Sequence, residues 1–157
     1  MPRIYQVTFV GVAISAAQDL VQITGATGKM IRILRQWLGL TNTSLPAAQS
    51  LSLRGRFLPA TVTVGSGGTT GITPSKRDQG DVACSTTTCA TNNTTQATTS
   101  GTAVVVYANG IHAYQGEAWV FQNPPLVGPS QAYVFELLST VSGTCTFSGG
   151  VEIEEMG

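Results

Sequence analysis

The sequence predicts an all-β protein, an antiparallel β-sandwich of the jelly-roll type with little or no helix. Apolar and polar residues alternate with a period of two in many short segments, and Gly and Pro separate these segments. Outside residues 29–38, no stretch of ten residues keeps a helical period. Many short strands joined by such turns are typical of sandwiches and barrels. Among these folds, the jelly roll best fits the number of strands and one long central excursion.

About ten or eleven short strands are expected, each rich in Val, Ile, Thr or aromatic residues, which favour strands. The alternation is clearest in residues 103–107 and 132–137. The expected strands are residues 4–10, 19–24, 29–39, 50–56, 60–64, 103–107, 111–116, 118–122, 132–137, 144–148 and 151–154.

Residues 29–38 (KMIRILRQWL) fit both a helix and a strand. Ile33 and Trp37 have helical spacing, but Ile31, Ile33 and Trp37 also share one face of a strand. The Gly-containing residues 25–28 before this segment are typical of a hairpin connection. We therefore interpret the segment as a strand.

Residues 65–81 and 84–101 show no period and are rich in Gly, Ser and Thr, so both are expected to be loops. Together they form one excursion over residues 65–101, and loops of such length are uncommon unless they are functional or supported by neighbours. The chain has no linker, internal repeat or change of composition, so residues 1–157 are expected to form one β-sandwich domain. Residues 1–10 are a candidate arm onto a neighbouring molecule.

Charge is unusually sparse. Eight Lys and Arg balance eight Asp and Glu, and charged residues make up 10% of the chain, whereas soluble domains average about 25%. Residues 82–116 contain no Asp, Glu, Lys or Arg. No basic excess indicates a nucleic-acid partner, and no apolar run is long enough to predict a membrane-spanning helix. Near-zero net charge favours association, so we expect the chain to pack against copies of itself or a partner lattice.

The few charges form clusters, which are the candidate interaction residues. We expect the basic clusters and the acidic C-terminal segment to meet across subunits. These residues are Arg32, Arg35, Arg54, Arg56, Glu152, Glu154 and Glu155. Glu136 lies in a strongly apolar strand, where burial would require an arginine partner from residues 29–35 or 54–56. An outward-facing position is the favoured interpretation for this side chain.

No residue pattern indicates catalysis. His112 is the only histidine, no G-x-S-x-G motif is present, and the acidic residues do not converge in the sequence. We therefore predict no catalytic residue, no cofactor and no metal site. The three cysteines are interpreted as thiols of a protein made in a reducing cytosol, although Cys84 and Cys89 would close a small loop if oxidised.

Several segments together resemble small β-sandwich structural proteins of tailed bacteriophages. They are residues 17–24 (AQDLVQIT), 29–41 (KMIRILRQWLGLT), 50–56 (SLSLRGR), 73–81 (TPSKRDQGD) and 92–99 (NNTTQATT). The chain is similar in pattern and composition to the jelly-roll decoration, or cement, proteins of the phage head. The resemblance implies homotrimers bound to the major capsid protein on the exterior of the virion, after synthesis in the host cytoplasm. It also implies that the protein is not an enzyme.

A carbohydrate- or receptor-binding module of a phage tail or fibre is the alternative function. Such a module needs aromatic side chains exposed near acids and amides. The sequence offers five candidates, each of which is expected on a strand and in the core. They are Trp37, Tyr107, Tyr114, Trp119 and Phe121.

Overall fold

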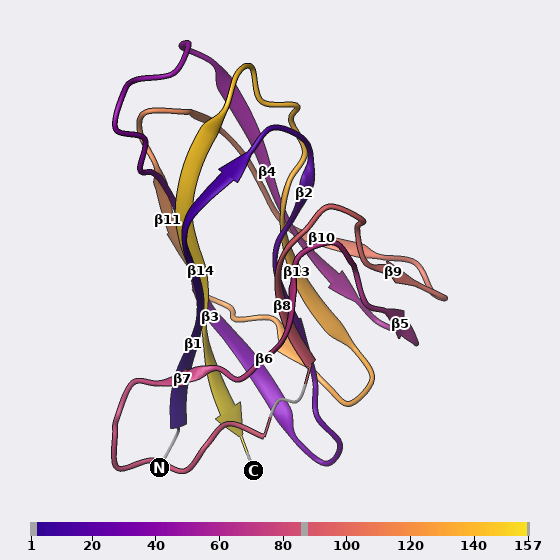
Figure 1. Ribbon diagram of the computed structural model, residues 1–157. Coiled ribbons are helices and arrows are strands. Elements are labelled where there is room, and N and C mark those ends of the chain that lie inside the picture. The colour runs from indigo at the N-terminus through magenta and orange to yellow at the C-terminus, as the bar shows by residue number, and fades with distance from the viewer. Residues whose placement is uncertain (1–2, 86–87, 157) are drawn as a thin grey trace.

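The computed structural model describes residues 3–85 and 88–156, which form two antiparallel β-sheets packed face to face (Figure 1). None of the described residues lies in a helix, and this part of the chain accordingly offers no helix that could span a membrane. The predicted all-β sandwich is confirmed.

The first sheet has the strand order β11-β3-β14-β1-β7, with β12 pairing with β3 on the same side as β11. Its strands are β1 (Arg3–Ile14), β3 (Met30–Leu40), β7 (Ser75–Lys76), β11 (Glu117–Val120), β12 (Leu126–Val127) and β14 (Cys145–Met156). The ambiguous residues 29–38 thus lie in a strand, as predicted.

The second sheet has the strand order β10-β4-β13-β2-β8-β6. Its strands are β2 (Gln18–Thr24), β4 (Ser50–Leu58), β6 (Thr69–Ile72), β8 (Thr88–Asn93), β10 (Val104–His112) and β13 (Ala132–Leu137). A separate ribbon pairs β5 (Val62–Thr63) with β9 (Thr98–Thr99).

Without the segment between β4 and β10, the chain is a jelly roll. The first sheet then reads β1-β14-β3-β11, and the second reads β2-β13-β4-β10. Consecutive strands β1 and β2, β3 and β4, and β10 and β11 lie in opposite sheets, which is the double-sheet arrangement of this fold. The sequence pattern predicted the fold class, whereas the strand order comes from the structure.

The excursion between β4 and β10 is more ordered than the sequence indicated. Instead of loops alone, it contributes β8 and β6, which extend the second sheet beyond β2, and β7, which pairs with β1. Cys89, Ala90 and Thr91 of β8 are buried. β8 (TCATNN) contains no Val, Ile or aromatic residue, so neither its period nor its composition marked it as a strand.

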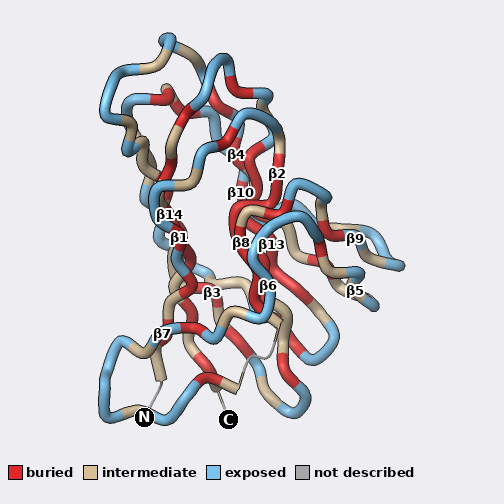
Figure 2. Tube along the Cα trace, viewed as in Figure 1, coloured by how far each residue is buried: buried red, intermediate tan, exposed pale blue. Residues whose placement is uncertain are grey.

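The core lies between the two sheets, where the buried segments of Figure 2 face one another. Tyr5, Val7 and Phe9 of β1 are buried in it, and residues Arg3–Phe9 pair with β14 of the same chain. The candidate arm over residues 1–10 is therefore corrected for residues 3–10, which form a strand inside the sheet. Residues 1–2 lie outside the described residues.

Two pairs of expected strands are each joined into one strand. Residues 103–107 and 111–116 contribute to one strand, β10, which bulges at Val106 and ends before a turn at residues 113–115. Residues 144–148 and 151–154 likewise belong to one strand, β14. Gly149 and Gly150 lie in the middle of β14, and only glycine fits there, because a Cβ at either position would come within 2.5 Å of a backbone oxygen of a neighbouring strand.

Candidate interaction surface

On one lateral side, each sheet of the sandwich ends in a strand with a neighbour on one side only among the described residues. β10 is the last strand of the second sheet, and β11 is the last strand of the first sheet's main path. The rings of Tyr107 on β10 and Trp119 on β11 lie 5.3 Å apart, so the two strands face each other across the sandwich. We call β10 and β11 together the open edge.

Large apolar side chains are exposed along the open edge. They are Val104, Val105 and Val106 on β10 and Trp119 and Val120 on β11, each between 38% and 66% exposed. The bulge at Val106 interrupts the alternation of β10, and all three consecutive valines are exposed. An apolar strand edge without Lys or Pro lacks the usual protection against pairing with another chain.

Polar and aromatic contacts hold the two strands of the open edge in place. The Tyr107 hydroxyl donates a hydrogen bond to Glu117, and Asn109 Nδ2 donates to both carboxylate oxygens of Glu117 at 2.9 Å. Burial, together with the hydrogen bond to Glu117, raises the pKa of Tyr107 above its ordinary value. Phe121 packs edge-on against both Tyr107 and Tyr133, which links the edge to the core.

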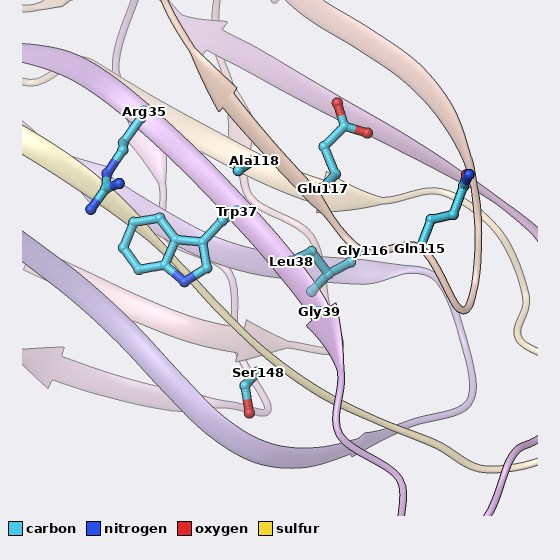
Figure 3. A pocket seen from close by; sticks show the side chains of 9 residues that line it. All are labelled: Arg35, Trp37, Leu38, Gly39, Gln115, Gly116, Glu117, Ala118 and Ser148. Carbon is cyan, nitrogen blue, oxygen red and sulfur yellow. The ribbon is translucent and has the colours of Figure 1, made fainter.

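A groove of about 700 Å³ lies beside β11 on the outer face of the first sheet (Figure 3). Trp37 and Arg35 extend from the same side of β3, whereas Glu117 points away from the Trp37 indole. The Arg35 guanidinium lies 5.1 Å from the centre of the indole, a cation–π contact. Gly150 pairs with Trp37, and a Cβ there would lie 2.7 Å from the indole, so only glycine leaves room for this ring.

The predicted interaction residues on β3 and β14 form ion pairs within the chain. Arg32 lies 2.7 Å from Glu154, and Arg35 lies 3.2 Å from Glu152. Each pair consists of residues that are directly opposite in the β3–β14 register. Glu155 in turn lies 3.7 Å from Lys29. The basic and acidic clusters therefore meet in one molecule, because the strands that carry them are neighbours.

The other two predicted interaction residues, Arg54 and Arg56, face Glu136. The Glu136 side chain is fully buried, Arg54 Nε lies 2.6 Å from its Oε2, and Arg56 pairs with its Oε1. Glu136 does lie on the outer face of the second sheet, but it is buried there, so its expected exposure is wrong and the alternative of a buried carboxylate with arginine partners is correct. Ala97 of the excursion lies over this face, hydrogen-bonded to Asp19 and Arg56, a cover that strand periodicity does not predict.

Of the five aromatic candidates, Trp37 is only partly buried, on the outer face of the first sheet, and the other four divide into two groups. Tyr107 and Phe121 are buried, as expected. Trp119 and Tyr114 are 45% and 41% exposed, so the expectation that they lie in the core is wrong. They stand on the last strand of the sheet and on the turn before it, where no further strand covers them. The charge-free run of valines beside them is the sequence signal that could have identified this edge.

The residues considered for catalysis lie apart. His112 ends β10 and packs its ring against Tyr114 at the surface. Cys84, Cys89 and Cys145 are buried, and burial raises the pKa of Cys89 to about 12. Among residues 3–85 and 88–156, no three His, Cys, Asp or Glu side chains gather as metal ligands would.

Comparison with known proteins yields little. No known family and no curated protein matches the chain. A structure of infectious bursal disease virus, Gx strain, is 16% identical over 98% of this chain and 42% of that chain, with a TM-score of 0.15. A chain of the T13 viral particle of IBDV is 14% identical over 99% of this chain and 39% of that chain, also with a TM-score of 0.15. The chain spans about two-fifths of these proteins, and likeness at this TM-score supports no conclusion about function.

Proposed function

We propose that this chain is a non-enzymatic structural protein of a virion, a decoration protein of a tailed bacteriophage that binds and stabilises the major capsid protein lattice. The open edge is the observation that carries this proposal. It presents half-exposed apolar side chains on strands that are fixed by internal contacts, and β10 has no charged residue. The jelly-roll topology and the resemblance of residues 17–99 to phage head proteins support the virion as its place of action.

The chemistry of the open edge suits a protein partner. Interface cores are depleted in Lys and Glu and enriched in aromatic residues. The open edge has a similar composition, because Trp119 lies among exposed valines and the edge carries no Lys. The unpaired backbone of β10 can also accept an added strand. Copies that associate through this edge would form the homotrimer that the resemblance implies.

A double variant, Val105→Lys with Val120→Lys, tests the proposal. Two lysines placed in an apolar contact would remain unpaired, so we expect a monomer where the wild type sediments as an oligomer at tens of micromolar. Co-sedimentation with purified capsid shells should fall at least about tenfold, as expected for 1.4 kcal/mol or more of lost binding free energy.

Val10→Lys is the matched control, because Val10 is 81% exposed on β1, away from the open edge. It should leave both sedimentation and shell binding at the wild-type level. A wild type that stays monomeric and ignores the shells, or a double variant that behaves like Val10→Lys, would contradict the proposal.

The groove beside β11 favours a second candidate function, a carbohydrate- or receptor-binding module of a phage tail or fibre. The Trp37 indole offers a flat apolar ring, and Arg35, Gln115 and Ser148 line the same groove with polar groups. A glycan array tests this candidate: Trp37→Ala should abolish any signal, and Trp119→Ala, on the open edge, should retain it. An array on which the wild-type protein binds no glycan would argue against it.

A further inference from the structure

A row of polar side chains crosses the outer face of the second sheet beneath residues 94–103. In cross-strand register it consists of Arg54, Glu136, Asp19 and Asn93. Glu136, Asp19 and Asn93 are fully buried. Two neighbouring carboxyl groups without access to water are costly unless hydrogen bonds or protons compensate them.

The oxygens of the two carboxyl groups are unequally satisfied. Asp19 Oδ2 accepts a hydrogen bond from the Ala97 backbone N–H at 2.6 Å, and Glu136 Oε2 accepts one from Arg54 Nε at 2.6 Å. Asp19 Oδ1 and Glu136 Oε1 have no hydrogen-bond donor in suitable geometry, although Arg56 makes an ion pair with the latter. The two carboxyl groups lie within hydrogen-bonding reach of each other, so one proton shared between them would supply a donor where one is missing.

The charges around Asp19 come from only two neighbouring strands. β13 contributes Glu136, and β4 contributes Arg54 and Arg56, while β8 contributes the uncharged Asn93. The covering residues 94–103 carry no charge. Burial, with repulsion from Glu136, raises the pKa of Asp19 to about 7, against the opposing effects of the Ala97 hydrogen bond and of Arg56.

Ala97 joins this carboxyl pair to the excursion. Its N–H donates to Asp19, and its carbonyl accepts a hydrogen bond from Arg56 at 3.1 Å. Its side chain packs with Leu58, Ala132 and Val134 in a small apolar cluster apart from the main core. Ala97 is thus fastened through both backbone groups and its methyl group to the face that it covers.

We propose that Asp19 and Glu136 form a proton-controlled latch: one proton shared by their carboxyl groups holds residues 94–103 on the second sheet, and loss of that proton loosens them. After the loss, two buried carboxylates repel each other beneath Ala97. Loosening uncovers the apolar cluster and the guanidinium of Arg56. The latch would therefore control access to a face that the open edge does not include.

The direction of the pH effect follows from the two states of Asp19. In the closed state the proton is retained up to about pH 7, whereas a hydrated carboxyl group in the opened state loses it near its ordinary value of 3.8. Opening therefore releases a proton between these values. The opening constant should rise by up to about tenfold per pH unit within this range and level off above it.

Hydrogen exchange of the Ala97 amide, corrected for its intrinsic rate and followed by NMR from pH 5 to 8, tests the latch. In the wild type we expect the opening constant to rise by up to about tenfold per pH unit from pH 5 to 7. Asp19→Asn should remove this dependence, because its amide keeps an oxygen for Ala97 N–H and supplies a permanent N–H for Glu136. Asp81→Asn, which removes a carboxylate from the turn after β7, should keep the wild-type profile.

Exchange at Ala97 that does not change with pH in the wild type, or an unchanged slope in Asp19→Asn, would overturn the latch. Carboxyl ¹³C titration of the wild type provides a second readout that does not depend on how the variant folds. The carboxyl signal of Asp19 should shift near pH 7. Complete ionisation of Asp19 below pH 5 would also refute the proposal.

Discussion

The two lateral sides of the sandwich differ in whether additional strands extend the sheets beyond the jelly roll. On one side, the excursion adds β8 and β6 beyond β2 and places β7 beside β1, and we call these three strands the covered edge. On the other side, no strand of the described residues pairs with the outer edge of β10 or β11. The outermost strands of the covered edge are only two and four residues long and carry Ser, Lys, Thr, Gly and one Ile that packs against the core, whereas β10 has nine residues and presents three exposed valines.

This difference concerns protection against pairing with other chains. Short polar strands at a sheet margin discourage pairing with other chains, and a long apolar margin invites it. A chain that protects one side in this manner and leaves the other bare is consistent with the proposed association through the open edge. Variants on the two sides should therefore affect different properties, folding on the covered edge and association on the open edge.

The largest effect is expected for Gly68→Val, next to the covered edge. A Cβ at Gly68 would lie 2.1 Å from the backbone oxygen of Thr91 on β8, so β6 would have to separate from β8. We expect the free energy of unfolding, measured by urea titration, to fall by roughly 2–4 kcal/mol.

Gly110→Ala is the matched change on the open edge. Its Cβ would meet only the Leu51 oxygen, at 3.9 Å, so its effect should stay within about 0.5 kcal/mol. Similar losses at Gly68 and Gly110 would contradict the distinction between the two sides.

A smaller effect is expected for Glu155→Gln, because Glu155 anchors residues 84–85, which lie just before β8 of the covered edge. Glu155 accepts hydrogen bonds from Ser85 N at 2.8 Å and from Cys84 Sγ at 3.4 Å. Although burial raises the pKa of Glu155, these bonds and Lys29 outweigh it and hold the pKa below its ordinary value of 4.5. We expect a loss of roughly 1–2 kcal/mol at pH 7.

The pH dependence sharpens this prediction. A lowered pKa means that the ionised carboxylate stabilises the fold above pH 4.5 and that this contribution disappears as the pH falls through the lowered value. The wild type and Glu155→Gln should therefore converge in stability in acid. Glu154→Gln, which alters a surface pair with Arg32, should cost less than about 1 kcal/mol. An equal cost for both variants would refute the special role of Glu155.

The smallest effect on folding is expected for Val105→Lys with Val120→Lys on the open edge. Both valines are more than half exposed, so the thermal unfolding of dilute protein should correspond to a change within about 0.5 kcal/mol per site. The same variant should lose association. Destabilisation of several kcal/mol would show that these residues serve the fold instead of a partner.

Strands with regular alternation could be predicted from the sequence, and those covered by distant segments could not. β3 and β13 were predicted because apolar side chains recur at alternate positions in both segments. β8 was missed because it consists of Thr, Cys, Ala and Asn, without the Val, Ile or aromatic residues that mark a strand. The burial of Glu136 depends on residues 94–103, some forty positions earlier in the chain, and its arginine partners were only an alternative.

The interaction surface shows the same limit. The charge-free residues 82–116 could be read directly from the sequence and indicated association. Their division into a buried strand, β8, and an exposed one, β10, follows from strand order, because β8 lies between β2 and β6 while β10 is last in its sheet. Residue type alone did not distinguish these two positions.

The bulge in β10 limits how far strand pairing between molecules could extend along this edge. Between Val105 and Tyr107 the register with β4 shifts, so the outward N–H and C=O groups of β10 do not form one continuous row. A strand from another molecule can pair along part of β10 only, and an unlimited stack of sheets, as in a fibril, is disfavoured. If the open edge binds other subunits as proposed, the bulge would be compatible with a finite assembly and would hinder amyloid-like polymerisation.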